Sequence, residues 1–430
     1  MRINKLVFKN GERFSILVGS DGIPLFYPTV FETDMRRQIN LASSTLDADL
    51  GIIKLLYRWA ESQQIDLETR FKQGKFLAVH EIINLAKTFK YRSDSYFGNQ
   101  EKLPDEQKAV KYQSKTISLE KFRKSEPERQ LVLVSTKLFA RRLNTAIGYL
   151  DWLAHIRTSW ASTSSKEYEA FQKARLEMKK NLESRIPEIK RDENYRREGL
   201  SKETQDILLE VIDPESSRNP WKNEFTRLRN QLFIHMLLKL GPRRGEILLT
   251  RIQRDINTRT NTLSIIRIPD DKDDPRRDEP NAKTLERELD FDEDLAKMVT
   301  DYITKIRNTI KGARRHDFLF VAAKTGRPLS KAAVTKMFRV LREKVPELPD
   351  DFTAHVLRHT WNDNFSEECD ETGVDEEIEK KTRCYLNGWK KGSRSADVYT
   401  QRYVKRKAQE VSLRRQEKIS KGGIKGDEKK

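Results

Sequence analysis

The segment Leu240-Gly-Pro-Arg-Arg-Gly-Glu-Ile-Leu248 marks the point where one apolar helix ends and another begins. An apolar stripe with helical spacing precedes it, from Phe225 to Leu240. Gly241-Pro242 ends that helix, because proline cannot continue one and glycine is common just after the last turn. Arg243 is therefore expected at a sharp turn beside a helix N-terminus, which favours a phosphate. Taken alone, the segment fits an ordinary interhelical turn at least as well.

A second segment, His355-Val-Leu-Arg-His-Thr360, follows about a hundred residues later. On a helix, His355 and Arg358 lie three positions apart and share a face, while Val356 and Leu357 are expected to face the core. A histidine and an arginine on one face can bind a phosphate and exchange a proton with it. In isolation, the segment fits a purely structural role equally well, in which the two histidines only pack at the edge of the core.

The third segment is Leu386-Asn-Gly-Trp389, which is followed by Tyr399 and Tyr403. Gly388 is expected to be the glycine that follows the C-terminus of a helix. A further helix over 395–416 would carry both tyrosines, four apart and hence on one face. Aromatic residues at this spacing are usually core residues, so this segment alone does not indicate chemistry.

Two strand-like segments, 263–268 and 285–291, are expected to pair as a hairpin with a long loop. Lys283, in Asn281-Ala-Lys-Thr284, lies at the edge of the second strand. A single lysine in a chain with 84 basic residues is not a signal by itself.

In order, these segments give Gly-x-Arg-x-Gly-Glu, a hairpin lysine, His-x-x-Arg-His, Gly-Trp and a tyrosine. This arrangement resembles the catalytic domain of the tyrosine recombinase (phage integrase) family over residues 198–412. The helical segment 41–165 is similar, more weakly, to the core-binding domain of that family. The resemblance implies a mainly α fold with a small antiparallel β-sheet, in which the two domains close around DNA as a clamp.

The resemblance also implies roles for individual residues. Arg243 and Arg358 would hold the scissile phosphate, and both stay protonated at any working pH. Lys283 would protonate the leaving 5′-hydroxyl, and His355 would assist proton transfer. Tyr399 would attack the phosphate and form a 3′-phosphotyrosine. Neither a metal nor another cofactor would be needed, because the arginines stabilise the charge.

The sequence departs from the family pattern near its end. Most members have a histidine where Trp389 stands, and an indole N–H donates a hydrogen bond but cannot shuttle a proton. Trp389 is therefore expected to position the phosphate and pack the site. It precedes Tyr399 by ten positions, one more than the usual spacing, which leaves Tyr403 as a rival nucleophile. Lys272 is the rival of Lys283, although the aspartates beside it would repel DNA.

Composition agrees with a DNA partner. The formal net charge is +18, which favours a polyanion, although a basic solvated surface is the alternative. Two cysteines, Cys369 and Cys384, are too few for a disulfide framework and indicate a reducing compartment. No apolar run approaches a membrane span, and the start Met1-Arg-Ile-Asn-Lys5 lacks an apolar signal region. A cytoplasmic location on DNA is expected.

The expected domain order has five parts. An N-terminal β element occupies 1–40, with strands on either side of Asn10-Gly11, and the core-binding domain occupies 41–165. A charged linker covers 166–197, the catalytic domain 198–412 and a basic tail 413–430. Basic residues that could contact DNA phosphates lie along the core-binding helices: Lys90, Lys137, Arg141, Arg142 and Arg157.

The expected function is site-specific cutting and rejoining of double-stranded DNA, in integration or excision of a mobile element. By resemblance, a homotetramer would act on two DNA sites, with accessory DNA-binding proteins as further candidates. Two alternatives remain: a type IB topoisomerase with the same chemistry, and a non-catalytic DNA-binding module.

Overall fold

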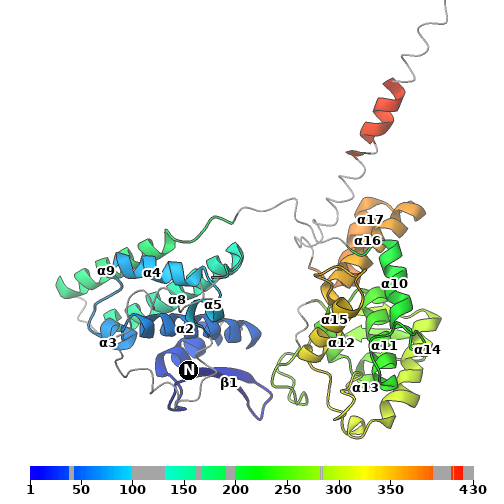
Figure 1. The fold of residues 1–430 in the computed structure, drawn as a ribbon, viewed down its shortest axis with the longest axis horizontal. Coiled ribbons are helices and arrows are strands. Elements are labelled where there is room, and N and C mark those ends of the chain that lie inside the picture. The colour runs from blue at the N-terminus through cyan, green and yellow to red at the C-terminus, as the bar shows by residue number, and fades with distance from the viewer. Residues whose placement is uncertain are drawn as a thin grey trace, which may run out of the picture. The chain divides into compact units, whose positions relative to one another are not determined.

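The computed structural model describes residues 1–37, 43–98, 131–159, 166–189, 199–280, 282, 284–390, 408–409 and 411–419. The chain divides into two compact units, Met1–Asp192 and Glu193–Lys430 (Figure 1). Each has its own hydrophobic core. None of the helices in these ranges combines the length and the apolar character that crossing a membrane requires.

The N-terminal unit begins with an antiparallel hairpin. Strands β1 (Arg2–Val7) and β2 (Arg13–Val18) pair from Arg2 opposite Val18 to Val7 opposite Arg13. Gly11 in the connecting turn has a φ of +91°, which glycine adopts without strain. The hairpin predicted around Asn10-Gly11 is therefore confirmed.

The prediction of strands throughout residues 1–40 is wrong for its second half. Phe26–Phe31 forms helix α1 and Glu32–Arg37 a π-helical turn, η1. Pro28 is the third residue of α1, where its missing amide hydrogen costs no helical hydrogen bond. Pro28 and Phe31 are the buried residues of α1, so the apolar run packs with helical spacing. Phe31 contacts Tyr149 and Trp152 with ring centroids 5.2 Å apart in each pair.

Helices build the rest of this unit. They are α2 (Ser43–Ser62), α3 (Leu67–Lys72), α4 (Val79–Phe89), α5 (Ser93–Phe97), α8 (Thr136–Ser159) and α9 (Lys166–Glu183). The core lies where α2, α4 and α8 meet and fully buries Trp59, Phe89 and Leu150. Helix α9 packs along α8, where Arg175 and Lys179 both bind Asp151.

The described part of the second unit is mainly helical and contains a small three-stranded sheet. Its helices are α10 (Lys202–Ile212), α11 (Glu224–Leu240), α12 (Arg244–Leu249), α13 (Ile252–Asp255), α14 (Glu293–Asp301), α15 (Lys331–Lys344), α16 (Ala354–Thr372) and α17 (Glu376–Asn387). Short irregular turns η4 (Tyr302–Ile306), η5 (Arg307–Thr309) and η6 (Ala313–Arg315) follow α14. Helix α11 is central and contacts α10, α12, α14 and α16.

The sheet has the order β3-β4-β5 and is antiparallel throughout. Its strands are β3 (Ile256–Asn257), β4 (Thr262–Ile265) and β5 (Arg287–Asp290). Leu263 lies opposite Leu289, and Ile265 lies opposite Arg287. The predicted hairpin is confirmed, and so is the mainly α fold with a small antiparallel sheet.

Candidate active site

Arg243 is the N-cap residue of α12. Helix α11 ends at Gly241, whose φ is +66°, and a Cβ there would lie 2.5 Å from the ring of Trp361. Glycine is therefore required for this turn. The backbone N–H of Arg243 donates to Glu246 Oε2 at 3.0 Å, and its guanidinium lies 3.6 Å from Glu246 Oε1. About a third of the Arg243 side chain is exposed, at 33%.

Glu246 is the buried anion of the site. Its Oε1 accepts from the Thr284 hydroxyl at 2.6 Å, and its Oε2 accepts from Arg287 Nη2 at 2.7 Å. Burial alone would raise the pKa of Glu246, but Arg287, the Thr284 hydrogen bond and the charge of Arg358 outweigh it. The pKa therefore lies below its ordinary value, and Glu246 is ionised at neutral pH.

Arg358 connects the C-terminal ends of two other helices, α11 and α17. It lies on α16 and is 3% exposed. Its Nη1 donates to the carbonyl of Gly241 at 2.5 Å, and its Nη2 donates to the carbonyl of Asn387 at 3.0 Å. Helix α16 therefore presents Arg358 where α11 and α17 end. The charge of Arg358 contributes to the lowered pKa of Glu246, and the Arg243 guanidinium lies 3.6 Å from the same carboxylate.

Trp389 follows directly from the end of α17. Gly388, with a φ of +62°, is the C-cap of that helix, as the sequence predicted. A Cβ at Gly388 would lie 2.8 Å from both the Leu285 carbonyl and Thr284 Cβ. The Leu285 amide also donates to the Gly388 carbonyl at 2.9 Å, so β5 and the end of α17 are in close contact. The buried Trp389 ring has its centroid 5.4 Å from the Arg358 guanidinium carbon.

His355 lies in the first turn of α16, on the same helix as Arg358. It is exposed, whereas Arg358 is buried. Its ring centroid is 4.5 Å from that of His359, at an interplanar angle of 68°. The two histidines therefore form an edge-to-face pair near the surface rather than part of the core.

Lys283, Tyr399 and Tyr403 lie outside the described residues, as does most of the helix predicted over 395–416. The neighbours of Lys283 are described. Ala282 and Thr284 are 2% and 7% exposed, and Thr284 bonds Glu246 in the first turn of α12. Thr284, which follows Lys283 in the sequence, is thus held near Arg243 through Glu246.

The rival Lys272 is exposed, in a loop that is anchored elsewhere. Asp271 binds Arg251 at 2.6 Å, and Arg276 donates to the Leu248 carbonyl at 3.0 Å. Both anchors lie at or beyond the C-terminal end of α12, whereas Arg243 is at its N-terminal end. The described anchors of the Lys272 loop thus lie toward the other end of α12 from Arg243.

Three contributors to the site were not predicted from sequence: Thr284, Arg287 and Asn387. Arg287 offered a signal, since Arg287, Leu289 and Phe291 alternate as the inward positions of β5 and its extension. A charged residue at an inward strand position requires a buried partner. Asn387 supplies only its carbonyl to Arg358, and sequence does not reveal backbone contacts of that kind.

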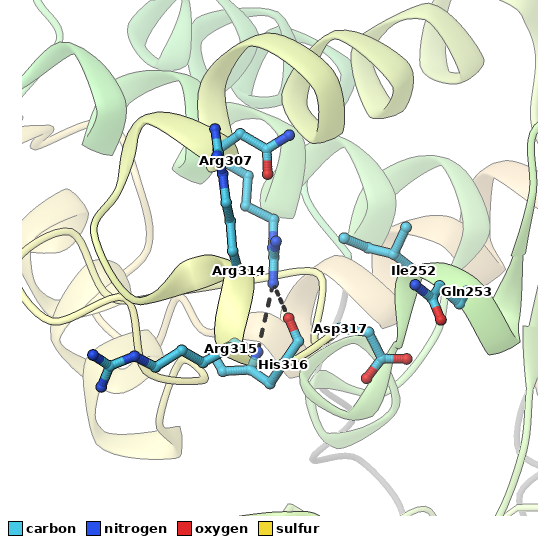
Figure 2. A pocket seen from close by; sticks show the side chains of 8 residues that line it. Ile252, Gln253, Arg307, Arg314, Arg315, His316 and Asp317 are labelled. Atoms are coloured by element: carbon cyan, nitrogen blue, oxygen red, sulfur yellow. Dashed lines mark hydrogen bonds between the residues drawn. The ribbon is translucent and has the colours of Figure 1, made fainter.

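A separate pocket in the same unit contains none of the predicted site residues. Arg307, Arg314, Arg315 and His316 line it together with residues of α13 (Figure 2). Arg307 Nη2 donates to the His316 carbonyl at 2.6 Å, and burial lowers the pKa of both side chains. Its cationic lining favours an anion, but the motif residues lie elsewhere.

The phage integrase family model matches residues 215–377. This range contains Arg243, His355 and Arg358 and ends before Trp389. Fold, motif and match together define a DNA strand-exchange enzyme of the tyrosine type. Residues 215–377 thus form a phage integrase family domain, which supports the tyrosine recombinase family for this chain.

Solved structures to which the chain is similar include three recombinases. XerA recombinase is 16% identical, with a TM-score of 0.33, over 60% of this chain and 77% of that chain. XerH site-specific recombinase in a post-cleavage complex with palindromic difH substrate is 15% identical, with a TM-score of 0.38, over 78% and 96%. A lambda integrase dimer bound to a COC′ core site is 16% identical, with a TM-score of 0.33, over 92% and 94%. No curated protein matches the sequence significantly. The family assignment depends on the domain match and not on these superpositions.

Proposed function

We propose that this recombinase cuts and rejoins DNA through a 3′-phosphotyrosine intermediate, with Tyr399 as the nucleophile. The Tyr399 oxygen attacks the scissile phosphorus, and the bond from phosphorus to the 5′-oxygen breaks. Lys283 delivers a proton to that leaving oxygen, and His355 assists proton transfer. The 5′-hydroxyl of another strand then reverses the step and releases the tyrosine. The bond energy is retained throughout, so no cofactor is consumed.

Arg243 and Arg358 bind the phosphate and stabilise the charge that develops on it. Trp389 positions the phosphate with its N–H and packs the site. The main support for this proposal is that three segments far apart in the sequence lie close together in the structure. Arg243 lies 3.6 Å from Glu246, Arg358 bonds the turn before Arg243, and Trp389 packs beside Arg358.

The substrate proposed for the whole chain is double-stranded DNA. Residues 41–165 would act as the core-binding domain, joined through 166–197 to the catalytic domain at 198–412. In the N-terminal unit Lys137 is exposed and suited to a phosphate contact. Arg142 has a structural role instead, since it donates to the carbonyls of Phe89 and Tyr91 at 2.8 and 2.6 Å. The side chain of Arg157 lies outside the described part of the chain.

The biological setting is proposed from the family alone. The enzyme would integrate or excise a mobile element in the cytoplasm, as a homotetramer on two DNA sites, with or without accessory DNA-binding proteins. A type IB topoisomerase would use the same chemistry on one duplex, so synapsis of two sites separates the two activities. A non-catalytic DNA-binding module would form no covalent adduct.

Covalent selection from random sequences tests the proposal, and the target site need not be identified beforehand. The full chain is incubated in EDTA with a pool of nicked duplexes that contain a randomised core, and DNA that survives denaturation on the protein is sequenced. Enrichment of one core sequence is expected, and it should depend on Tyr399. A chain that binds DNA strongly but traps none of the pool is not the proposed enzyme. Joining two trapped sites in a second reaction then distinguishes recombination from relaxation.

A further inference from the structure

Arg287 is a buried cation that none of the roles above uses. It lies at the start of β5, opposite Ile265, and its side chain is fully buried. Its Nε donates to the Leu386 carbonyl at 2.7 Å, its Nη1 to the Thr284 hydroxyl at 3.1 Å, and its Nη2 to Glu246 at 2.7 Å. One guanidinium thus joins β5, α12 and the last turn of α17.

These contacts link Arg287 to three segments of the proposed site. Thr284 flanks Lys283, Glu246 holds the backbone of Arg243, and Leu386 precedes Gly388 and Trp389. The guanidinium of Arg287 also lies against Gly388, where an added Cβ would meet Nη1 at 2.7 Å. Because the fork of Arg287 is planar and rigid, it fixes these segments at defined distances.

The charges around Glu246 determine which arginine neutralises its carboxylate. Glu246 is ionised, and Arg287 is its nearest cation, at 2.7 Å against 3.6 Å for Arg243. If Arg287 were absent, the cationic neighbours left to the carboxylate among the described residues would be Arg243 and Arg358. A buried carboxylate recruits such a partner strongly. Glu246 would then compete with the DNA phosphate for the arginines that should bind it.

We propose that Arg287 is a positioning residue that occupies Glu246 and so keeps Arg243 and Arg358 available for the scissile phosphate. This inference rests on the proposed phosphate-binding roles of those two arginines. Arg287 itself is not expected to touch the DNA. It acts through the carboxylate that it neutralises and through the segments that it holds together.

The test compares covalent adduct formation by the full chain on the selected duplex. Arg287→Met should lower the cleavage rate on the order of 10²-fold, as loss of a phosphate ligand does, and should leave DNA affinity unchanged. Adding Glu246→Gln should then raise the rate about tenfold above Arg287→Met alone, because the competing charge is gone. A residue that served only to stabilise the fold would not respond in this way, since the second change removes a further buried contact.

Two controls complete the test. In an Arg287→Lys background, which keeps the cation, Glu246→Gln should bring no gain. Arg229 is a matched buried arginine that bonds Asn230 and the Val321 carbonyl, away from the site. Arg229→Met should reduce the melting temperature without any recovery of cleavage from Glu246→Gln.

The outcomes are separable. If the unmodified chain forms no adduct, the proposed function fails. If it does, and Glu246→Gln gives no gain in the methionine background, the role assigned to Arg287 is wrong. If the Arg287→Met variant does not fold, the Arg287→Lys variant provides the test. In that variant the carboxylate of Glu246 still has its cation, so a higher cleavage rate after Glu246→Gln would contradict the role proposed for Arg287.

Discussion

Arg243 and Arg358 are proposed for the same task, but they differ in how much of the fold depends on them. A third of the Arg243 side chain is exposed, whereas Arg358 is buried and donates to two backbone carbonyls. Loss of Arg358 would leave the Gly241 and Asn387 carbonyls without these donors, at roughly 1–3 kcal/mol for each buried group. Substitution of either arginine should therefore impair catalysis, but only substitution of Arg358 should also destabilise the fold.

Arg243→Ala and Arg358→Ala should each reduce cleavage by ~10²–10³. Most DNA binding should remain, because many other basic residues contact the backbone. Only Arg358→Ala should also lower the melting temperature of the catalytic unit. Adduct formation and thermal denaturation on the same preparations check both parts. Cleavage by Arg243→Ala within tenfold of the unmodified rate would remove Arg243 from the phosphate site.

The lowered pKa of Glu246 makes a prediction about acid stability. A carboxyl group with a depressed folded pKa adds stability that is present above its unfolded pKa of about 4.3 and is lost as the pH falls through the folded value. Glu246→Gln should therefore cost about 3 kcal/mol at pH 7, and the difference should shrink as the pH falls below about 4. Denaturant titrations followed by tryptophan fluorescence from pH 7 to pH 3 measure it. A difference that does not change with pH would show that Glu246 is not held ionised.

At the scale of elements, the ends of helices α11 and α17 were predictable, because glycine marks each one. Gly241 and Gly388 both adopt positive φ, at +66° and +62°. The predicted strand pair was found because its apolar residues alternate. The helical nature of 26–37 was missed, because Pro28 and the apolar run fit a strand as well as the first turn of a helix. Strand β3 has only two residues, too few for any periodicity.

The residues of the candidate site that belong to a sequence motif could be predicted. The residues that matter only through tertiary contacts could not. Arg243, Arg358 and Trp389 stand at turns or on helix faces that sequence patterns identify. Arg287 and Thr284 acquire their importance only when β5 meets α12 and α17. Such long-range contacts leave no local period in the sequence.

Gly388 offers a test of the contact between α17 and β5, with Gly373 as its matched control. Both are helix C-caps with positive φ, at +62° and +69°. A Cβ at Gly388 would meet backbone and side-chain atoms of 284–287, whereas nothing lies within 4 Å of one at Gly373.

Gly388→Ala should therefore abolish most cleavage, because it pushes β5 and the flank of Lys283 away from α17. Gly373→Ala should cost only the strain of a left-handed alanine, about 1 kcal/mol, and should keep cleavage. Melting temperatures and adduct yields of the two variants are compared side by side. Equal losses of cleavage in both would mean that the contact of Gly388 with β5 does not matter to the site.

For the whole molecule, all the proposed chemistry lies in the second unit, Glu193–Lys430. Residues 193–430 alone should therefore still form a small amount of adduct. Their DNA affinity should be much lower, and its dependence on salt weaker, because the phosphate contacts of the N-terminal unit are lost. Binding titrations at several salt concentrations measure both. A folded fragment with undiminished affinity would refute the DNA-binding role given to 41–165.

The nucleophile is the central claim, and the residues that decide it, Tyr399 and Tyr403, lie beyond Trp389 on the chain. A phenol must lose its proton as it attacks, and its ordinary pKa is about 10, so only a tyrosine at the arginine-bound phosphate should react. Phenylalanine keeps the ring and removes only the reacting oxygen. Tyr399→Phe should bind DNA normally and form no adduct, while Tyr403→Phe should still form one.

The most direct measurement is peptide mapping of the covalent adduct. The full chain is trapped on the nicked duplex, digested with protease and nuclease, and sequenced by mass spectrometry to locate the remaining nucleotide. We expect the nucleotide to be attached through a 3′-phosphate to Tyr399. Attachment at Tyr403 would contradict the assignment of the nucleophile, and attachment at any residue other than a tyrosine would contradict the mechanism itself.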